Sequence, residues 1–363
     1  MGTIKQNRAN NILTSGKLDA IDGLNNDIPA SNIANASFSN VTAYPPSAGT
    51  VVTKVASDPP SPSEGQVWFN TTSNVLKQYT LAAGSWASGG NLGTARQSIK
   101  GAGTQTAGLA FSGYIGTLPF STATEEYDGA AWTAGGNMGS ARVNLAGLGT
   151  QTAGLAAAGE TTTVQNATEE YDGSAWTAGG NVATARQQLA GCGIQTAGLI
   201  FGGLAPGYSS ATEEYDGASW TTGGNLTVAT KGLAGAGTQT AGLAFGGETP
   251  PFTNTNATGE YDGSTWTSGG NLNTAREHLS GAGIQTAALA FGGDNPTPGF
   301  LNVTEEYNGA SWTTVSSMAT GRYLFGGAGT QTEALAFGGN SGSITNVTEE
   351  WTAGLQIQTI TVS

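Results

Sequence analysis

Apolar positions along most of this chain fall in short runs that glycine-rich or polar turns separate. A small-residue run such as NLAGLG from Asn144 predicts a first strand, and the Gly-x-Gln-Thr segment at 149–152 predicts a tight turn. AGLAFGG from Ala241 predicts a second, apolar strand. NATEEYD from Asn166 alternates like a third strand, and SAWTAGG from Ser174 predicts a fourth, reached through an Asp-Gly turn. No helical periodicity competes with this reading, so the unit is four strands.

The four-strand unit is repeated along the chain. The tyrosine of its third strand recurs at spacings of 44, 44, 46 and 46 residues, and Trp351 occupies the same slot another 44 residues on. Four strands in roughly 45 residues, repeated, predict the blades of a β-propeller. The tyrosines are Tyr127, Tyr171, Tyr215, Tyr261 and Tyr307, and a glutamine recurs as Gln105, Gln151, Gln195, Gln239, Gln285 and Gln331.

The order of residues within each unit resembles a known motif. A glycine pair, then Tyr, then Trp, then Arg recurs over about residues 89–351 and is similar to the Kelch repeat. The resemblance agrees with the physical reading, because small residues suit a crowded central channel and aromatic rings can wedge between blades. The expected fold class is therefore all-β, a six-bladed Kelch-like β-propeller of four-stranded blades with an extended N-terminal arm.

The last unit lacks a tryptophan strand of its own, while an unmatched Tyr79–Trp86 pair lies upstream of the first unit. We expect the Trp86 strand to complete the last blade and close the ring. An alternative is that LQIQTITV from Leu355 supplies this strand. The expected organisation is an arm and linker over 1–64, a β-hairpin or adapter over 65–88 and the propeller over 89–363.

Repeated charges predict contacts that hold the scaffold together. A cation precedes each first strand, and a Glu-Glu pair lies in most third strands. We expect one glutamate of each pair to meet the cation of its own or an adjacent blade; a ring of carboxylates that binds Ca²⁺ is the alternative. The recurring aspartates are expected to serve the turns. The predicted inter-blade residues are Arg96, Arg142, Arg186, Lys231, Arg276, Arg322, Glu126, Glu170, Glu214, Glu260 and Glu306.

Charge and composition exclude several classes of partner. The net charge is −13, and from Gly89 onward seven basic residues face 20 acidic ones. Such a surface repels phosphate, so we expect no nucleic-acid partner. No apolar run is long enough to span a membrane, and the N-terminus lacks the apolar core of a secretory signal, so no membrane insertion is expected. One cysteine permits no intrachain disulfide.

The chain offers little catalytic chemistry. The single histidine, His278, has no Cys, His or Ser partner in its repeat slot, and the single cysteine, Cys192, aligns with small apolar residues of other units. Adjacent glutamates on a strand point to opposite faces, which argues against a glycosidase pair. We therefore expect no enzyme, no catalytic residue, no cofactor and no bound metal.

The units differ most between the glycine pair and the third strand, so a binding site is expected in those loops. In a four-stranded blade these connections all emerge on one face. They carry aromatic residues, which suit contact with protein or sugar surfaces. The alternative is that these rings only pack the loops down. The candidate contact residues are Tyr114, Phe120, Tyr208, Phe252 and Phe300.

Two N-terminal segments resemble phage particle proteins. GTIKQNRANNILTSGKLDA from Gly2 is similar to the start of virion proteins of marine and freshwater tailed phages, and PSEGQVWFNTTSNVLKQYTLAAGSW from Pro62 to a module of phage tail and fibre proteins. The resemblance implies a homo-oligomer in the virion, in its tail, baseplate or fibre, that contacts other virion proteins through residues 1–64 and a host surface glycan or protein through the propeller. A capsid-surface appendage, a Kelch interaction module outside a virion and, last, a glycan-active enzyme are the alternatives.

Overall fold

The computed structural model describes residues 53–59, 66–296 and 299–360, and this part of the chain consists of β-strands and their connections, with no helix. It therefore contains no helix that could cross a membrane. The chain divides into two compact units, one of residues 1–82 with 354–363 and one of residues 83–353. Most of the predicted arm, residues 1–52 and 60–64, lies outside the described residues.

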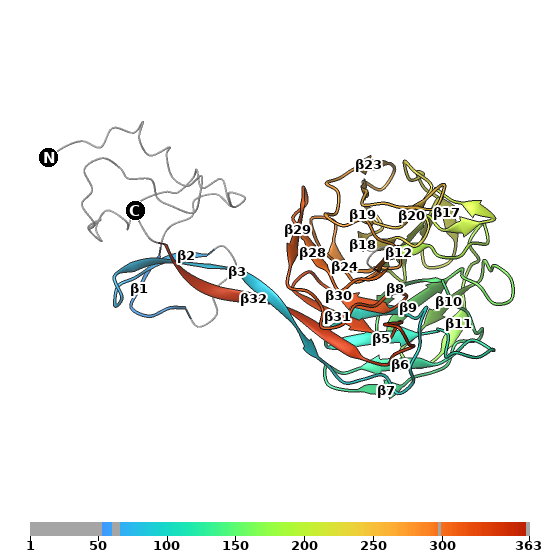
Figure 1. The fold of residues 1–363 in the computed structure, drawn as a ribbon, viewed down its shortest axis with the longest axis horizontal. Coiled ribbons are helices and arrows are strands. Elements are labelled where there is room, and N and C mark those ends of the chain that lie inside the picture. Colours follow the sequence, from blue (N-terminus) through green and yellow to red (C-terminus); the bar gives the residue numbers. More distant parts are fainter. Residues whose placement is uncertain (1–52, 60–65, 297–298, 361–363) are drawn as a thin grey trace. The chain divides into compact units, whose positions relative to one another are not determined.

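The larger unit is the predicted all-β propeller, with its strands arranged around a centre (Figure 1). Five of its blades are separate four-stranded antiparallel sheets. Blade 1 holds β4 (Lys100–Thr104), β5 (Ala107–Phe111), β6 (Thr124–Tyr127) and β7 (Trp132–Ala134). Blade 2 holds β8 (Ala146–Thr150), β9 (Ala153–Ala157), β10 (Thr168–Tyr171) and β11 (Trp176–Ala178). Blade 3 holds β12 (Ala190–Ile194), β13 (Ala197–Phe201), β16 (Thr212–Tyr215) and β17 (Trp220–Thr222).

Blade 4 holds β18 (Ala234–Thr238), β19 (Ala241–Phe245), β22 (Thr258–Tyr261) and β23 (Trp266–Ser268). Blade 5 holds β24 (Ser280–Ile284), β25 (Ala287–Phe291), β28 (Thr304–Tyr307) and β29 (Trp312–Val315). Blade 6 is part of a longer sheet, with β30 (Gly326–Gly329), β31 (Glu333–Phe337), β32 (Thr348–Ile360) and β3 (Val75–Ser88) in that order. The six-bladed architecture is thus confirmed.

The second strand of each blade is buried along nearly its whole length because both faces of a blade pack against its neighbours. In β13, Leu199 and Phe201 have no exposed surface. They share a core cluster with Cys192 of their own blade and with residues of blade 4 such as Leu233 and Trp266. The hydrophobic cores of the propeller therefore lie between blades.

The fourth position of blade 6 belongs to β3. Its order in the sheet places β3 beside β32, and the first strands contact one another in the closed order β4, β8, β12, β18, β24, β30, β4. The strand that carries Trp86 thus occupies the place we expected for it. The alternative is excluded, because the segment from Leu355 continues β32, the third strand.

Three sets of side-chain hydrogen bonds join neighbouring blades. The indole N–H of each fourth-strand tryptophan donates to a threonine of the preceding blade, and Trp86 donates to Thr304 at 2.9 Å in the same way. The recurring glutamines donate to backbone carbonyl oxygens of the preceding blade; Gln105 of blade 1 reaches those of Ala334 and Trp351 in blade 6. The tyrosine hydroxyls donate to the second glutamate of the preceding blade, as Tyr171 does to Glu126 at 2.5 Å.

The buried arginines meet a glutamate of their own blade, one of the two expected arrangements, but the named glutamates are not the ones they meet. Each contacts the first glutamate of its own blade, not the second: Arg186 lies 2.8 Å from Glu213, and both side chains are almost completely buried. The other Oε of that glutamate accepts from Ala183 N–H, in the connection that arrives from the preceding blade. The other pairs are Arg96–Glu125, Arg142–Glu169, Arg276–Glu305 and Arg322–Glu349.

The second glutamates serve the tyrosine bonds between blades. The pairs are Tyr171–Glu126, Tyr215–Glu170, Tyr261–Glu214, Tyr307–Glu260 and Tyr127–Glu350. Glu306 has the corresponding position in β28. Lys231 does pair with Glu277 of the next blade as well as with Glu248 of its own, but its predicted place in the arginine slot of blade 4 is wrong. Thr230 takes the arginine slot there and Gly259 the glutamate slot, so that the ion pair is replaced on both sides at once.

The smaller unit contains β1 (Thr53–Val55), which runs parallel to β2 (Val67–Asn70). β2 pairs antiparallel with the first part of β3, which is the predicted hairpin. Asp58 accepts hydrogen bonds from the buried Trp68 indole at 3.0 Å and Asn70 at 2.7 Å, and it pairs with Lys77 at 2.6 Å. These three donors, Lys77 first, lower the pKa of Asp58 to about 2. Asp58 therefore connects the segment after β1 to the hairpin.

Candidate functional site

One face of the propeller is built from the connections that vary most between blades. We name it the loop face: the loops from the second to the third strand together with the connections that enter each blade. In each blade the residue after the arginine slot forms a backbone bridge with the start of the loop. Three loops also form small hairpins: β14 (Leu204–Ala205) with β15 (Gly207–Tyr208), β20 (Glu248–Thr249) with β21 (Thr253–Asn254), and β26 (Asp294–Asn295) with β27 (Gly299–Phe300). The bridges are Gln97–Tyr114, Val143–Glu160, Gln187–Leu204, Lys231–Glu248, Glu277–Asp294 and Tyr323–Asn340.

A ring of backbone hydrogen bonds lies at the centre of the loop face. In each connection that enters a blade, the residue that follows the bridging residue has a positive φ, between 50° and 64°. Among the described residues, five backbone bonds join successive members of this ring, all except the pair Ser98 and Asn144; one is His278 N–H to the Gly232 carbonyl oxygen at 2.7 Å. This ring holds both its members and the residues just before them in fixed positions. Its members are Ser98, Asn144, Gln188, Gly232, His278 and Leu324.

The five predicted aromatic residues do not form one patch. Tyr114 packs edge-on against Phe120 at 5.9 Å, and Tyr208 against Phe252 at 6.4 Å. Phe300 stacks on Tyr323 at 5.0 Å. Phe252 is 79% exposed and Phe300 45%, while the other three are half-buried. Two of the five rings are thus open to solvent. Tyr114 and Phe120 pack within their own loop, and Tyr208 packs against the loop of blade 4.

Next to Phe252 lies a set of ionisable residues that we name the charged cluster: Tyr208, Lys231, Glu248, Glu277, His278 and Asp294. Lys231 Nζ lies 2.9 Å from Glu248 Oε1 and 3.4 Å from Glu277 Oε2. The Tyr208 hydroxyl donates to Glu248, and Lys231 Nζ is 5.8 Å from the centre of the Tyr208 ring. The cluster thus joins blades 3, 4 and 5 across the loop face.

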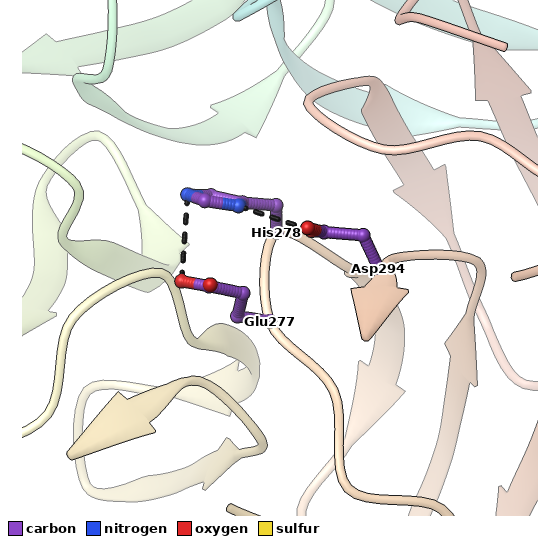
Figure 2. Close-up of side chains that lie close together, drawn as sticks. All are labelled: Glu277, His278 and Asp294. Atoms are coloured by element: carbon purple, nitrogen blue, oxygen red, sulfur yellow. Dashed lines mark hydrogen bonds and ion pairs between the residues drawn. The ribbon is translucent and has the colours of Figure 1, made fainter. Parts of the chain in front are cut away.

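The imidazole of His278 lies between two carboxylates (Figure 2). Its Nδ1 is 3.1 Å from Asp294 Oδ1, and its Nε2 is 3.7 Å from Glu277 Oε2. The distance at Nδ1 is that of a hydrogen bond, whereas Nε2 is buried without a hydrogen-bond partner among the described residues. The ring is therefore oriented by Asp294 and presents Nε2 towards Glu277.

The pKa values of the two glutamates of the cluster are shifted in opposite directions. Burial raises the pKa of Glu277, against the attraction of His278 and Lys231. Burial acts in the same sense on Glu248, but hydrogen bonds from Tyr208 and Lys231 outweigh it and the pKa of Glu248 is lowered. Burial opposes the charge of Lys231, yet the hydrogen bond to Glu248 and the charge of Glu277 raise its pKa. Lys231 therefore stays charged and neutralises part of the cluster.

The geometry limits what the charged cluster can do. Glu277, His278 and Asp294 each offer a ligand atom, and these atoms lie within 4.8 Å of one another. One ion cannot use all three as they stand, because the carboxylates face opposite nitrogens of the same ring. One carboxyl with a raised pKa (Glu277) and one with a lowered pKa (Glu248) resemble the acid and base of a hydrolase. However, the Lys231 ammonium lies within 3.4 Å of both glutamates and occupies the space that a scissile bond would need. Hydrogen bonding to a polar ligand suits the cluster better.

The repeat pattern does not predict this cluster as a unit. In the sequence His278 has no catalytic partner in its repeat slot, and Lys231 matches the cations of the scaffold. The available signal was the departure of blades 4 and 5 from the repeat: a lysine and a glutamate lie where the other blades carry Gln97, Val143, Gln187 or Tyr323. Cys192, in contrast, is buried, its Sγ lies 3.6 Å from the Thr238 carbonyl oxygen, and burial raises its pKa to about 12, as suits an inert thiol.

No model of a known protein family matches the chain, and no curated protein matches it.

Proposed function

We propose that this chain is a structural protein of a phage virion, a tail, baseplate or fibre component. In this proposal residues 1–64 dock on the particle, and a Kelch-like propeller is displayed outward to contact a host surface glycan or protein. The virion assignment rests on the resemblance of the two N-terminal segments to phage particle proteins. The recognition role rests on the loop face.

The observation that carries the recognition role is the contrast between scaffold and loop face. Tryptophan–threonine and glutamine–carbonyl bonds recur in all six blades. The charged cluster occurs once among the described residues, beside the exposed ring of Phe252. An exposed aromatic ring next to fixed hydrogen-bonding groups is suited to sugar or protein surfaces. Residues that the scaffold does not need are thus gathered where a partner would bind.

The virion assignment is tested by imaging purified particles that carry a tag on this protein. Full-length protein is expected on the particle, and protein without residues 1–52 is expected to be lost from it, because this segment lies outside both β1 and the propeller. Label on particles of both forms would reject the docking role of the arm. Label on neither would reject the virion assignment and favour a free-standing Kelch interaction module.

The recognition role is tested by binding of the full chain to host cells, with Phe252→Ser as the variant. Phe252 is 79% exposed, so the substitution leaves the core unchanged, and we expect at least a tenfold loss of affinity, about 1.4 kcal/mol. The matched control is Ile194→Ser, which changes a residue that is 51% exposed at the end of the first strand β12, away from the loop face. Equal binding by both variants would show that the contact with the host surface does not lie on the loop face.

A further inference from the structure

The central channel of the propeller contains one charged side chain among small neighbours. Lys100, the first residue of β4, lines a cavity of about 70 Å³. The equivalent first-strand residues of the other blades are Ala146, Ala190, Ala234, Ser280 and Gly326. By this measure one water needs about 10–15 Å³, so the cavity can hold several waters or a small ion.

The ammonium group of Lys100 is unpaired. Among the described residues it makes no hydrogen bond or ion pair, and no aspartate or glutamate lines the cavity. Lys100 is half-buried, and the surrounding protein removes part of its hydration, which lowers its pKa to about 8. An uncompensated charge in such a place is costly, unless a counter-ion joins it.

The lining lets an anion approach this ammonium closely. Apart from Lys100, the cavity is lined by glycines, alanines, one serine and a few larger apolar side chains. A Cβ at Gly147 would lie 2.8 Å from the Lys100 Cβ, so a glycine there makes room for the lysine stem. Each first strand is also the terminal strand of its sheet, so part of its backbone N–H groups have no partner within the sheet and can donate to an anion.

We propose that the central channel is an anion site, in which a small monovalent anion such as a halide or a carboxylate binds to the Nζ of Lys100. The anion neutralises Lys100, the one charged group among the described residues that line the cavity, and takes hydrogen bonds from the ammonium. The site is separate from the charged cluster, and it does not depend on the proposed function.

The direct test uses bromide as the probe, in crystals of the full chain and of Lys100→Ala. We expect an anomalous bromide peak within hydrogen-bonding distance of Nζ in the wild type and none in the channel of the variant. The variant should fold, because alanine occupies the same slot in blades 2, 3 and 4. An empty channel in the wild type, or an unchanged peak in Lys100→Ala, would overturn the proposal.

A measurement in solution gives an independent answer. The thermal midpoint is followed against bromide concentration at constant ionic strength, for the wild type, Lys100→Met and, as a control that removes a charge elsewhere, Lys54→Met. At pH 7 the wild type and the control should gain stability relative to Lys100→Met, and the gain should vanish as the pH rises above about 8, where the ammonium is lost. An identical bromide response of all three proteins would reject the site.

Discussion

Five buried arginine–glutamate pairs are the most consequential residue-scale feature of the scaffold. Arg186 has no exposed surface and donates to the carbonyl oxygens of Gly202 and Ala211 as well as to Glu213. A buried pair costs a large desolvation energy, so removal of one partner leaves a charge that nothing compensates. Blade 4 shows the consistent alternative, because Thr230 and Gly259 replace both partners together.

The first prediction tests the buried pair of blade 3 with substitutions taken from blade 4. Arg186→Thr alone should destabilise the protein by about 3–5 kcal/mol, since Glu213 would remain buried and unpaired. The double variant Arg186→Thr/Glu213→Gly, which copies blade 4, should be more stable than that single variant. Urea denaturation measures both. If the double variant were the less stable of the two, the unpaired charge would not be the cause of the loss.

The inter-blade tyrosines predict sensitivity to alkaline pH. Burial, reinforced by the hydrogen bond to Glu260, raises the pKa of Tyr307 to about 12, and four further tyrosines behave alike. Tyrosine in an unfolded chain has a pKa of about 10, so between pH 10 and 12 the unfolded state loses protons that the folded state keeps. Stability should therefore fall as the pH rises through this window.

The urea midpoint, measured between pH 9 and 12, checks this prediction. Tyr307→Phe should lower stability at pH 8 because it removes the hydrogen bond to Glu260, yet make the alkaline fall shallower. Absorbance at 295 nm should show tyrosinate forming together with unfolding. A midpoint that stays constant up to pH 12 would show that these hydroxyls titrate as they do in the unfolded chain.

At the scale of elements, the critical strand is β3, because it comes from the N-terminal side of the chain and completes the last blade. Without it β32 would become a sheet edge, and Thr304 would lose the hydrogen bond from Trp86. Open edges pair with other chains, so both stability and solubility depend on this strand.

Two fragments isolate the effect of this strand. Fragment 83–353 keeps the end of β3 with Trp86, whereas fragment 89–353 lacks only those six residues. We expect the longer fragment to be a folded monomer and the shorter one to melt lower or associate. Calorimetry and sedimentation compare them. Equal melting and equal mass would show that ring closure does not need β3.

For the whole molecule, the closed ring predicts one cooperative unfolding transition of residues 83–353. Trp176→Phe and Trp312→Phe each remove an indole N–H bond to a threonine of the preceding blade, Thr124 and Thr258, in distant parts of the ring. Each should cost about 0.5–1.5 kcal/mol, plus some packing, and shift the same transition. Two resolved transitions in calorimetry, one per variant, would mean that blades unfold independently.

The sequence by itself determined the blade, the blade count and the face where variation gathers, because a period of 44 or 46 residues and alternation within strands are local properties of the chain. It also pointed to the strand of Trp86 as the closing strand, since only that unit had a missing partner. It misplaced Lys231, because matching by charge put a lysine in the arginine slot that Thr230 occupies in space.

Only the tertiary structure decided which glutamate of each pair meets the arginine, since neighbouring residues on a strand face opposite sides and the sequence does not say which side holds the cation. It also decided that Lys231, Glu248, Glu277, His278 and Asp294 meet. These residues belong to two blades and come together through the ring of backbone bonds at the centre of the loop face. The same holds for Lys100, whose isolation depends on the six first strands that enclose the channel.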